Sequence, residues 1–368
     1  MTNTESRAQN VRRRTLDGPD EKNGGARKGT GGTDSPSALT RRRIRRAAVL
    51  VTLVVAGCLI AALLVLVPRG SIGPPVVKEP PPSALPERVV GGYWMKWRES
   101  NSVRLADIDP RYNVVYVSFA EGAQGTGALQ FRQTAQPPEQ FAEDLATLRA
   151  RGQRVILSIG GKHGYVDMST PQRRQQMVDS LIRIHREEVP FDGIDWDIEY
   201  VPFDVDAALE VSAALKEHFG PNLAITLAPP GGDRNDYKEM ARRLGDDLGY
   251  IGVQYYDYPA PDQTERLAGV QHRTRELQTV YGIPADKIVI GMAVVDENTD
   301  RYAGADTTHY WTLDSSLQGW EELNKEFPGL RGVYLWEISG DAHLGGAWVA
   351  NLAPAVGPNG QGAPASPR

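Results

Sequence analysis

With 368 residues, 40% of them hydrophobic, the chain can bury one large core, and its single cysteine, Cys58, excludes a disulfide within the chain. The formal net charge is −5, but residues 1–46 hold 12 Lys and Arg against 5 Asp and Glu, leaving 29 against 41 in the remainder. An acidic main body argues against nucleic acid as a partner, because phosphate binding requires clustered basic side chains on the folded surface.

A long apolar segment follows the basic tail. Residues 1–46 are rich in Gly, Ser, Thr, Asp and Arg, and we predict a disordered cytoplasmic tail there. The tail ends in RRRIRR, and residues 47–67 then run for 21 residues without a charge, enough for a helix to cross about 30 Å of hydrocarbon. Because flanking arginines stay inside the cell, the sequence predicts a single-pass transmembrane signal anchor, with the larger C-terminal part extracellular.

Two alternatives to this anchor remain open. The letters VAGC at residues 55–58 resemble a bacterial lipobox, in which cleavage before Cys58 leaves a lipoprotein anchored at that cysteine. The nine apolar residues after Cys58 favour the uncleaved helix instead. A buried helix of a soluble core is the other alternative. In both anchored forms the membrane is a partner of the chain.

The remaining segments divide into a linker, one main domain and a short tail. Residues 68–86 are dense in proline and predict an extended, semi-rigid linker. Residues 356–368 are predicted to be a disordered tail. Within residues 87–355, eight short β-branched runs alternate with amphipathic segments, which is typical of an α/β fold with parallel strands. The runs begin near residues 88, 113, 154, 193, 223, 250, 287 and 332.

Eight strand–helix repeats in about 270 residues predict a (β/α)8 TIM barrel. An open, doubly wound sheet is the alternative, but no glycine-rich phosphate loop follows the first run. Functional groups of a TIM barrel gather at the carboxyl ends of its strands. Several of the runs do become polar or aromatic at their ends, such as DIEY at residues 197–200 and YYDY at residues 255–258.

The fourth run, GIDWDIEY, carries acids at every second position. Because side chains alternate between the two faces of a strand, Asp195, Asp197 and Glu199 share one face, and the apolar residues between them share the other. The apolar face must pack under the helices, so the three acids line the barrel interior. Asp192 falls off this parity, and a turn, a cap or a supporting role all fit it.

Three carboxylates in one buried lumen repel one another and lose hydration, so at least one pKa should rise. A carboxyl with a raised pKa is what a general acid requires at neutral pH. Buried ion pairs are one alternative, but no Lys or Arg stands at the carboxyl ends of the eight runs. A Mg²⁺ or Ca²⁺ site built from these oxygens is another alternative that stays open.

Residues 192–199 match the DxxDxDxE signature of the family 18 glycoside hydrolases, and the chain resembles that family along the whole predicted barrel. Ser158, Gly160 and Gly161 match the SxGG strand of the family. Five further residues stand where the family builds its sugar-binding subsite: Tyr93, Phe119, Gln254, Asp257 and Trp336.

The resemblance implies a substrate-assisted, retaining mechanism, in which the 2-acetamido oxygen of the sugar attacks the anomeric carbon. It implies that Glu199 is the acid and base, that Asp197 turns between Asp195 and the acetamido N–H, and that Tyr256 binds the acetamido oxygen. Asp257 is expected to contact the sugar, and Trp336 to form the floor beneath it.

The implied function is hydrolysis of β-1,4-linked N-acetylglucosamine polymers, chitin or chito-oligosaccharides, without a metal or cofactor. Peptidoglycan and N-glycan cores are alternative substrates containing the same sugar. A non-catalytic, chitin-binding lectin on the same barrel is an alternative of a different class. Such relatives typically lose the terminal Glu of the signature, whereas this chain keeps Glu199.

Overall fold

The structure of the protein is a computed structural model that describes residues 81–97, 103–199, 203–231, 234–256, 260–294 and 310–357. The predicted tail (1–46), anchor (47–67) and Cys58 lie outside these ranges, as does nearly all of the C-terminal tail. Within the described ranges, no helix has both the length and the apolar character that crossing a bilayer requires. The predicted anchor therefore stays a prediction.

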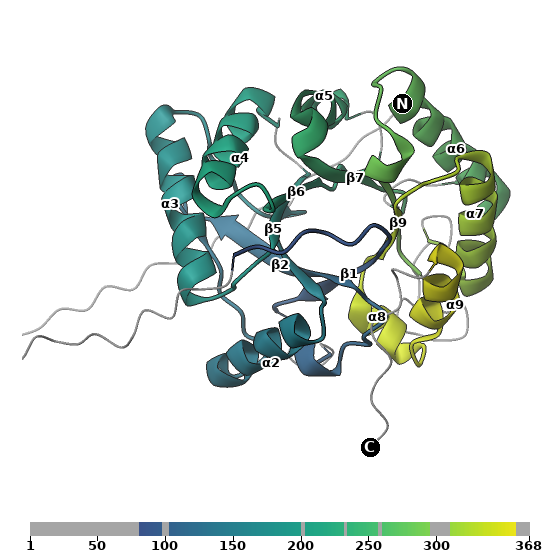
Figure 1. The fold of residues 1–368 in the computed structure, drawn as a ribbon, viewed down its shortest axis with the longest axis horizontal. Coiled ribbons are helices and arrows are strands. Elements are labelled where there is room, and N and C mark those ends of the chain that lie inside the picture. The colour runs from purple at the N-terminus through teal and green to yellow at the C-terminus, as the bar shows by residue number, and fades with distance from the viewer. Residues whose placement is uncertain are drawn as a thin grey trace, which may run out of the picture. The chain divides into compact units, whose positions relative to one another are not determined.

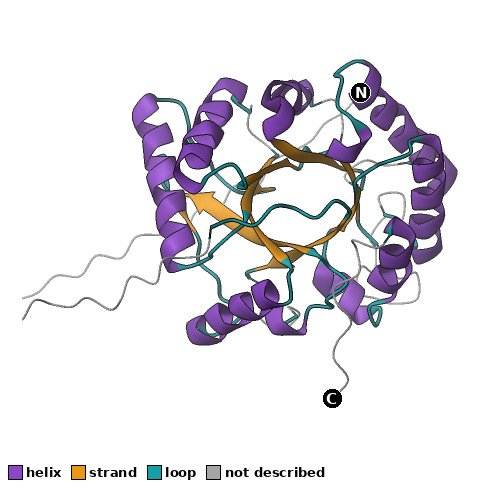
Figure 2. Cartoon of the chain, in the orientation of Figure 1, coloured by secondary structure: helices purple, strands orange, loops and turns teal. Residues whose placement is uncertain are grey.

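Eight parallel strands close into a barrel, which confirms the predicted (β/α)8 fold (Figures 1 and 2). The strands are β1 (Val89–Met95), β2 (Val114–Gly122), β4 (Arg154–Gly161), β5 (Gly193–Ile198), β6 (Ala224–Leu227), β7 (Leu248–Gln254), β8 (Ile288–Met292) and β9 (Gly332–Leu335). Pairing of β9 with β1 completes the ring, with Val90 opposite Val333. This closure excludes the open sheet. A short strand, β3 (Leu129–Gln130), pairs antiparallel with the last residues of β2.

Helices surround the barrel on its outer side, as Figure 2 shows. They are α2 (Pro138–Ala150), α3 (Pro171–Glu187), α4 (Val205–Phe219), α5 (Asn235–Leu244), α6 (Gln263–Thr279), α7 (Leu313–Glu326), α8 (Ile338–His343) and α9 (Ala347–Val356). Local sequence explains where several of them begin. Thr170, Asp204, Asp262 and Thr312 each accept a hydrogen bond from a backbone N–H in the first turn, which is the usual N-cap.

Tyrosines fill the lower part of the barrel interior. The rings of Tyr93 and Tyr116 stack with centroids 4.3 Å apart, and the hydroxyls of Tyr116 and Tyr250 are 2.5 Å apart. Glycine makes room for the ring of Tyr334, since a Cβ on Gly291 would lie 2.4 Å from its hydroxyl oxygen. The tyrosines therefore pack this part of the lumen as a core, and only the end at the carboxyl termini of the strands is open for a ligand.

Residues 82–86, which we call the strap, cross the amino-terminal mouth of the barrel (Figure 1, the darkest blue ribbon). The backbone N–H of Ser83 donates to Asp192 at 2.9 Å, and Arg331 donates to the carbonyl oxygen of Pro86 at 2.8 Å. Leu85 packs against the tyrosine cluster in the lumen. The last residues of the predicted linker segment are thus bonded to the barrel.

Removing the strap should destabilise the barrel. A fragment that begins at residue 88 loses these hydrogen bonds and exposes the lumen under Leu85, which should lower the free energy of unfolding by about 2–4 kcal/mol relative to a fragment that begins at residue 81. Urea denaturation of the two fragments, both ending at residue 368, measures the difference. Equal midpoints would show that the strap contributes nothing.

Candidate active site

A cleft of about 560 Å³ opens at the carboxyl ends of the strands, opposite the strap. Its lining is formed by twelve residues: Trp97, Phe119, Glu121, Gly160, Lys162, His163, Asp197, Glu199, Gln254, Tyr256, Tyr310 and Trp336. Seven of these were predicted from the sequence as site residues. The cleft therefore brings together residues from strands that are far apart in the chain.

The other predicted site residues lie in different places. Tyr93, Ser158 and Asp195 are buried directly beneath the cleft. Asp192 lies at the opposite end of β5, where it accepts hydrogen bonds from the strap and from the N–H of Val155. It is also paired with Arg149 of α2. It thus joins the strap to the barrel, far from the cleft. Asp257 lies outside the described residues.

Asp195 is held by three hydroxyl groups. Tyr93 and Ser158 both donate to its Oδ2 at 2.8 Å, and Thr226 donates to its Oδ1 at 2.7 Å. The strand register produces this arrangement, because Ser158, Asp195 and Thr226 lie side by side on β4, β5 and β6. Burial raises the pKa of Asp195 above its ordinary value, and the three hydrogen bonds offset part of that rise.

Asp197 is the next acid along the same face, and it is 2% exposed. Gln254 donates a hydrogen bond to its Oδ1 at 2.8 Å. Burial raises the pKa of Asp197 well above its ordinary value, and the charges of Glu199 and Asp195 raise it further. Glu199 follows the end of β5, half-buried in the cleft wall. Asp197 is therefore more easily protonated than an exposed aspartate.

The two glycines of the SxGG strand make space for these groups. Gly160 and Gly161 have φ angles of +102° and +76°, in the left-handed region that favours glycine. A Cβ on Gly160 would lie 2.5 Å from the carbonyl oxygen of Asp197, and one on Gly161 would lie 2.6 Å from the ring of Phe119. A side chain at either position would displace the neighbouring strand or the aromatic wall.

A row of aromatic rings forms the floor and one wall of the cleft. Trp336 stacks on Phe119 with centroids 5.9 Å apart and an interplanar angle of 19°, and Phe119 stacks on Trp97 at 5.7 Å and 24°. Tyr256 lines the cleft and is hydrogen-bonded to Tyr334 beneath it. Flat apolar rings of this kind can pack against the C–H face of a sugar while acids act on its polar groups.

Sequence reasoning missed the residues that hold the end of β5. The hydroxyl of Tyr237 accepts a hydrogen bond from the N–H of Ile198 at 2.6 Å. Arg234 donates to the carbonyl oxygens of Ile198 and Glu199 at 3.1 and 3.3 Å, and it is paired with Asp236 at 2.8 Å. Their residue types give no local signal of this role. Thr226 was also missed, although its place on the lumen side of its strand could have revealed it.

Replacing Tyr237 with Phe should disturb the placement of Glu199. The buried N–H of Ile198 loses its acceptor, which should lower the free energy of unfolding by about 1–3 kcal/mol. We expect any activity that depends on Glu199 to fall about tenfold, because small misplacements of a reacting group are costly. Tyr281→Phe is the matched control, since Tyr281 bonds Asn235 at the surface. A Tyr237→Phe variant with unchanged melting temperature and rate contradicts this assignment.

The site suits proton transfer. Within the described ranges, no three His, Cys, Asp or Glu side chains converge in a way that could hold a metal ion. Both oxygens of Asp195 are already bonded to hydroxyl groups. What the arrangement provides is a line of three acids that ends at Glu199, beside an aromatic floor. Such a line can deliver a proton to a bond held above Trp336.

Proteins similar to this chain are found among the chitinases. Chitinase Chi52 of Paenibacillus xylanexedens is 30% identical over 194 residues, which are 45% of this chain and 37% of that protein, so the chain spans little more than a third of that relative. A family GH18 chitinase from Chromobacterium violaceum superposes with a TM-score of 0.62, at 22% identity, over 78% of this chain and 91% of the other.

A chitinase-like agglutinin from Robinia pseudoacacia also superposes, with a TM-score of 0.56 and 20% identity, over 73% of this chain and 99% of the other. At these identities, likeness to the two solved structures shows the fold. The family itself is shown by sequence. The pattern of the family described as glycosyl hydrolases family 18 matches residues 89–337, from the first strand of the barrel to just beyond the last. The chain therefore belongs to family 18 of the glycosyl hydrolases.

Proposed function

We propose that the protein is a glycosidase that cleaves β-1,4-linked N-acetylglucosamine polymers, chitin or chito-oligosaccharides. The observation that carries this proposal is the line of acids on β5. Asp195 is locked by three hydroxyls, Asp197 has a raised pKa, and Glu199 stands last in the line, in a cleft floored by Trp336. This arrangement supports a substrate-assisted, retaining hydrolysis.

In the first step, Glu199 donates its proton to the glycosidic oxygen as that bond breaks. The acetamido oxygen of the same sugar attacks the anomeric carbon and forms an oxazolinium ion. Asp197 accepts a hydrogen bond from the acetamido N–H and stabilises the positive charge of the oxazolinium ion. Tyr256 donates a hydrogen bond to the acetamido oxygen. In the second step, Glu199 removes a proton from water, and the water oxygen bonds to the anomeric carbon as the bond between that carbon and the acetamido oxygen breaks. The acetamido group is restored, and the product keeps the configuration of the substrate. Asp257 is proposed to contact the same sugar.

Binding without catalysis is the second candidate, because a chitinase-like agglutinin shares the fold. Retention of Glu199 and Asp197 in the cleft favours catalysis over binding alone. Incubating the protein with chitin oligomers, with purified peptidoglycan and with N-glycan cores separates the candidates. We expect oligomers to be cut, with the β-anomer of the product appearing first by NMR. Oligomers that bind uncut would indicate a lectin, and cleavage of only another glycan would reassign the substrate.

We further propose that residues 47–67 anchor the protein in the cell membrane, with the barrel outside the cell. The charge-free run and the arginines before it support this. The full chain should fractionate with membranes, whereas a chain lacking residues 1–70 should be soluble and active. The mass of the chain in the membrane fraction tests the lipoprotein alternative. A full-length chain supports the uncleaved helix, and a chain that begins at a lipid-modified Cys58 supports the lipid anchor.

A further inference from the structure

A buried lysine holds a carboxylate at the wall of the cleft. Lys96 follows β1 and is 6% exposed. Its Nζ donates to Oε2 of Glu121 at 2.6 Å and to the carbonyl oxygen of Phe119 at 2.5 Å, and it lies 5.6 Å from the centroid of the Phe131 ring. The side chain of Glu121 is 44% exposed and lines the cleft. The ammonium is thus inside the protein, and its partner faces the ligand space.

Stability alone does not explain this pair. Taking an ammonium out of water costs several kcal/mol, and attraction to a carboxylate offsets this only in part, so an apolar side chain at such a position is often as stable or more stable. The neighbouring ring of Phe131 would accept an apolar side chain. The pair does have one clear structural effect, which is to fix the carboxylate of Glu121 at the wall.

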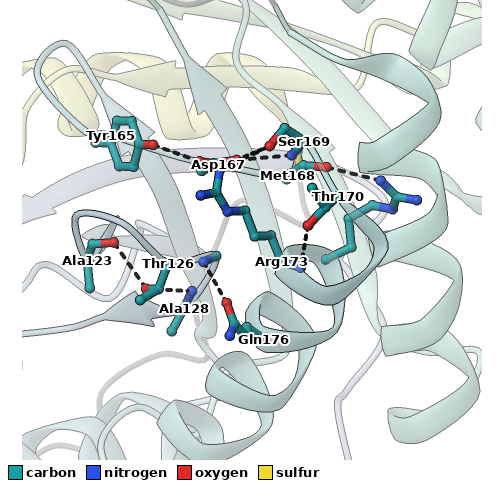
Figure 3. Close-up of polar contacts among 12 residues, drawn as sticks. Ala123, Thr126, Ala128, Tyr165, Asp167, Met168, Ser169, Thr170, Arg173 and Gln176 are labelled. Atoms are coloured by element: carbon teal, nitrogen blue, oxygen red, sulfur yellow. Dashed lines mark hydrogen bonds and ion pairs between the residues drawn. The ribbon is translucent and has the colours of Figure 1, made fainter.

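The wall that carries Glu121 is itself rigid. The residue after it, Gly122, donates its N–H to the carbonyl oxygen of Tyr165 at 2.6 Å, so the loop after β2 is bonded to the loop after β4. A Cβ on Gly122 would lie 2.3 Å from that oxygen, which only glycine avoids. Figure 3 shows the two loops, with Thr126 and its neighbours in one and Tyr165 in the other. Glu121 is therefore held in place before a ligand arrives.

Polar contacts around Asp167 fix the second loop. Asp167 accepts hydrogen bonds from the hydroxyl of Tyr165 at 2.8 Å and from the hydroxyl of Ser169 at 2.7 Å, and it is paired with Arg173 at the start of α3 (Figure 3). Gln176 of the same helix accepts the N–H of Gly127 at 2.9 Å. One helix thus holds both loops, which makes the wall a preformed surface.

The position of Glu121 points to a second sugar unit. The aromatic row runs from Trp336, the proposed floor under the reacting sugar, through Phe119 to Trp97. Glu121 lies two residues beyond Phe119 on the same strand. Within the described residues, its Oε1 has no hydrogen-bond partner, whereas Oε2 is bonded to Lys96. A free carboxylate oxygen accepts hydrogen bonds from hydroxyl and amide N–H groups.

We propose that Glu121, held by Lys96, is a specificity-determining residue that binds a further N-acetylglucosamine unit of the substrate. Its Oε1 accepts a hydrogen bond from a hydroxyl or acetamido N–H of a sugar beyond the one that lies over Trp336. The inference rests on the proposed function. It adds the side chain that recognises a sugar unit next to the reacting one, and the buried lysine that holds this side chain in place.

The test measures KM for N-acetylglucosamine oligomers of two to six units. In Glu121→Gln the charge of the acceptor is lost, and in the double variant Lys96→Met/Glu121→Ala the acceptor is lost without leaving a buried, unpaired ammonium. We expect the KM of the double variant to rise about tenfold for oligomers long enough to reach Glu121, with a smaller rise for Glu121→Gln and with kcat nearly unchanged. Shorter oligomers should show no change.

Glu139→Gln is the matched control, since Glu139 is an exposed carboxylate on α2 that does not line the cleft. Melting temperatures of all variants are measured in parallel. A KM ratio that is the same at every chain length overturns the inference, as does a fall in melting temperature with no change in KM. If the wild-type protein binds oligomers without cutting them, the proposed function fails, and the same length series measured as Kd by tryptophan fluorescence decides the inference separately.

Discussion

Replacing Glu199 with Gln is expected to reduce hydrolysis of chitin oligomers by at least about 10³-fold, the upper part of the range for loss of a general acid and base. Gln has nearly the same shape as protonated Glu but cannot transfer a proton. Because Glu199 stands past the end of β5 and is only half-buried, its replacement leaves the core intact. Folding and sugar binding should therefore be retained.

Three measurements on the Glu199→Gln variant check this expectation: kcat by product chromatography, Kd for the oligomers, and melting temperature. Glu139→Gln again serves as the control, and it should behave as the wild type does. Hydrolysis by Glu199→Gln near the wild-type rate would move the acid role to another group in the cleft. Loss of binding together with hydrolysis would show instead that Glu199 mainly holds the substrate.

Replacing Asp197 with Asn should lower the rate and raise the stability at the same time. The rate should fall about 10²-fold or more, because Asn cannot stabilise the charge that develops on the oxazolinium ring. Stability should rise by about 1 kcal/mol at neutral pH, a typical gain when a strained site group is removed. Asn can still accept the hydrogen bond from Gln254 that Asp197 accepts.

The pH dependence of that gain follows from the raised pKa of Asp197. Below the pKa of the unfolded chain, about 3.9, the carboxyl is protonated in both states and costs nothing. As the pH rises, the unfolded chain releases its proton first, so the folded state loses stability up to the folded pKa. The advantage of Asp197→Asn should therefore be largest at neutral pH and disappear near pH 3–4.

Melting temperatures of the wild type and Asp197→Asn between pH 3 and 8 give the result directly. A variant that is less stable than the wild type at pH 7 would mean that the charged carboxylate is stabilised where it lies, and the raised pKa assigned to Asp197 would then be wrong. Asp195→Asn is a useful comparison. Its three hydroxyl donors already offset part of the burial cost, so we expect little or no gain in stability from it.

The sequence predicted the barrel because its signals are local and periodic. The run near residue 193 became β5, and its alternation placed Asp195 and Asp197 in the lumen, since a period of two leaves only one choice of face. The SxGG strand, in contrast, was assigned only by its resemblance to the family, and the structure supplies the physical reason for its glycines. Its glycines are needed where the backbone of β4 approaches Asp197 and Phe119, and few other residues fit there.

The supports of the site could not be predicted in the same way. Tyr237 contacts Ile198 across 39 residues of sequence, and Lys96 meets Glu121 across 25. Pairs of this kind depend on which loops the closed barrel brings together, and a tyrosine or lysine after a strand is common in any chain. Asp192 differs from these supports, because it belongs to the signature and yet contributes nothing to the cleft. It lies before β5, where it binds the strap. The N-terminal anchor stays a prediction.

The strap also makes the two mouths of the barrel unequal for a polymer. Residues 82–86 lie across the mouth opposite Glu199, and Leu85 packs against the tyrosines in the lumen, so a sugar chain cannot thread through the barrel. The site is therefore one-ended, and a polymer has to lie across the cleft and leave by the same face.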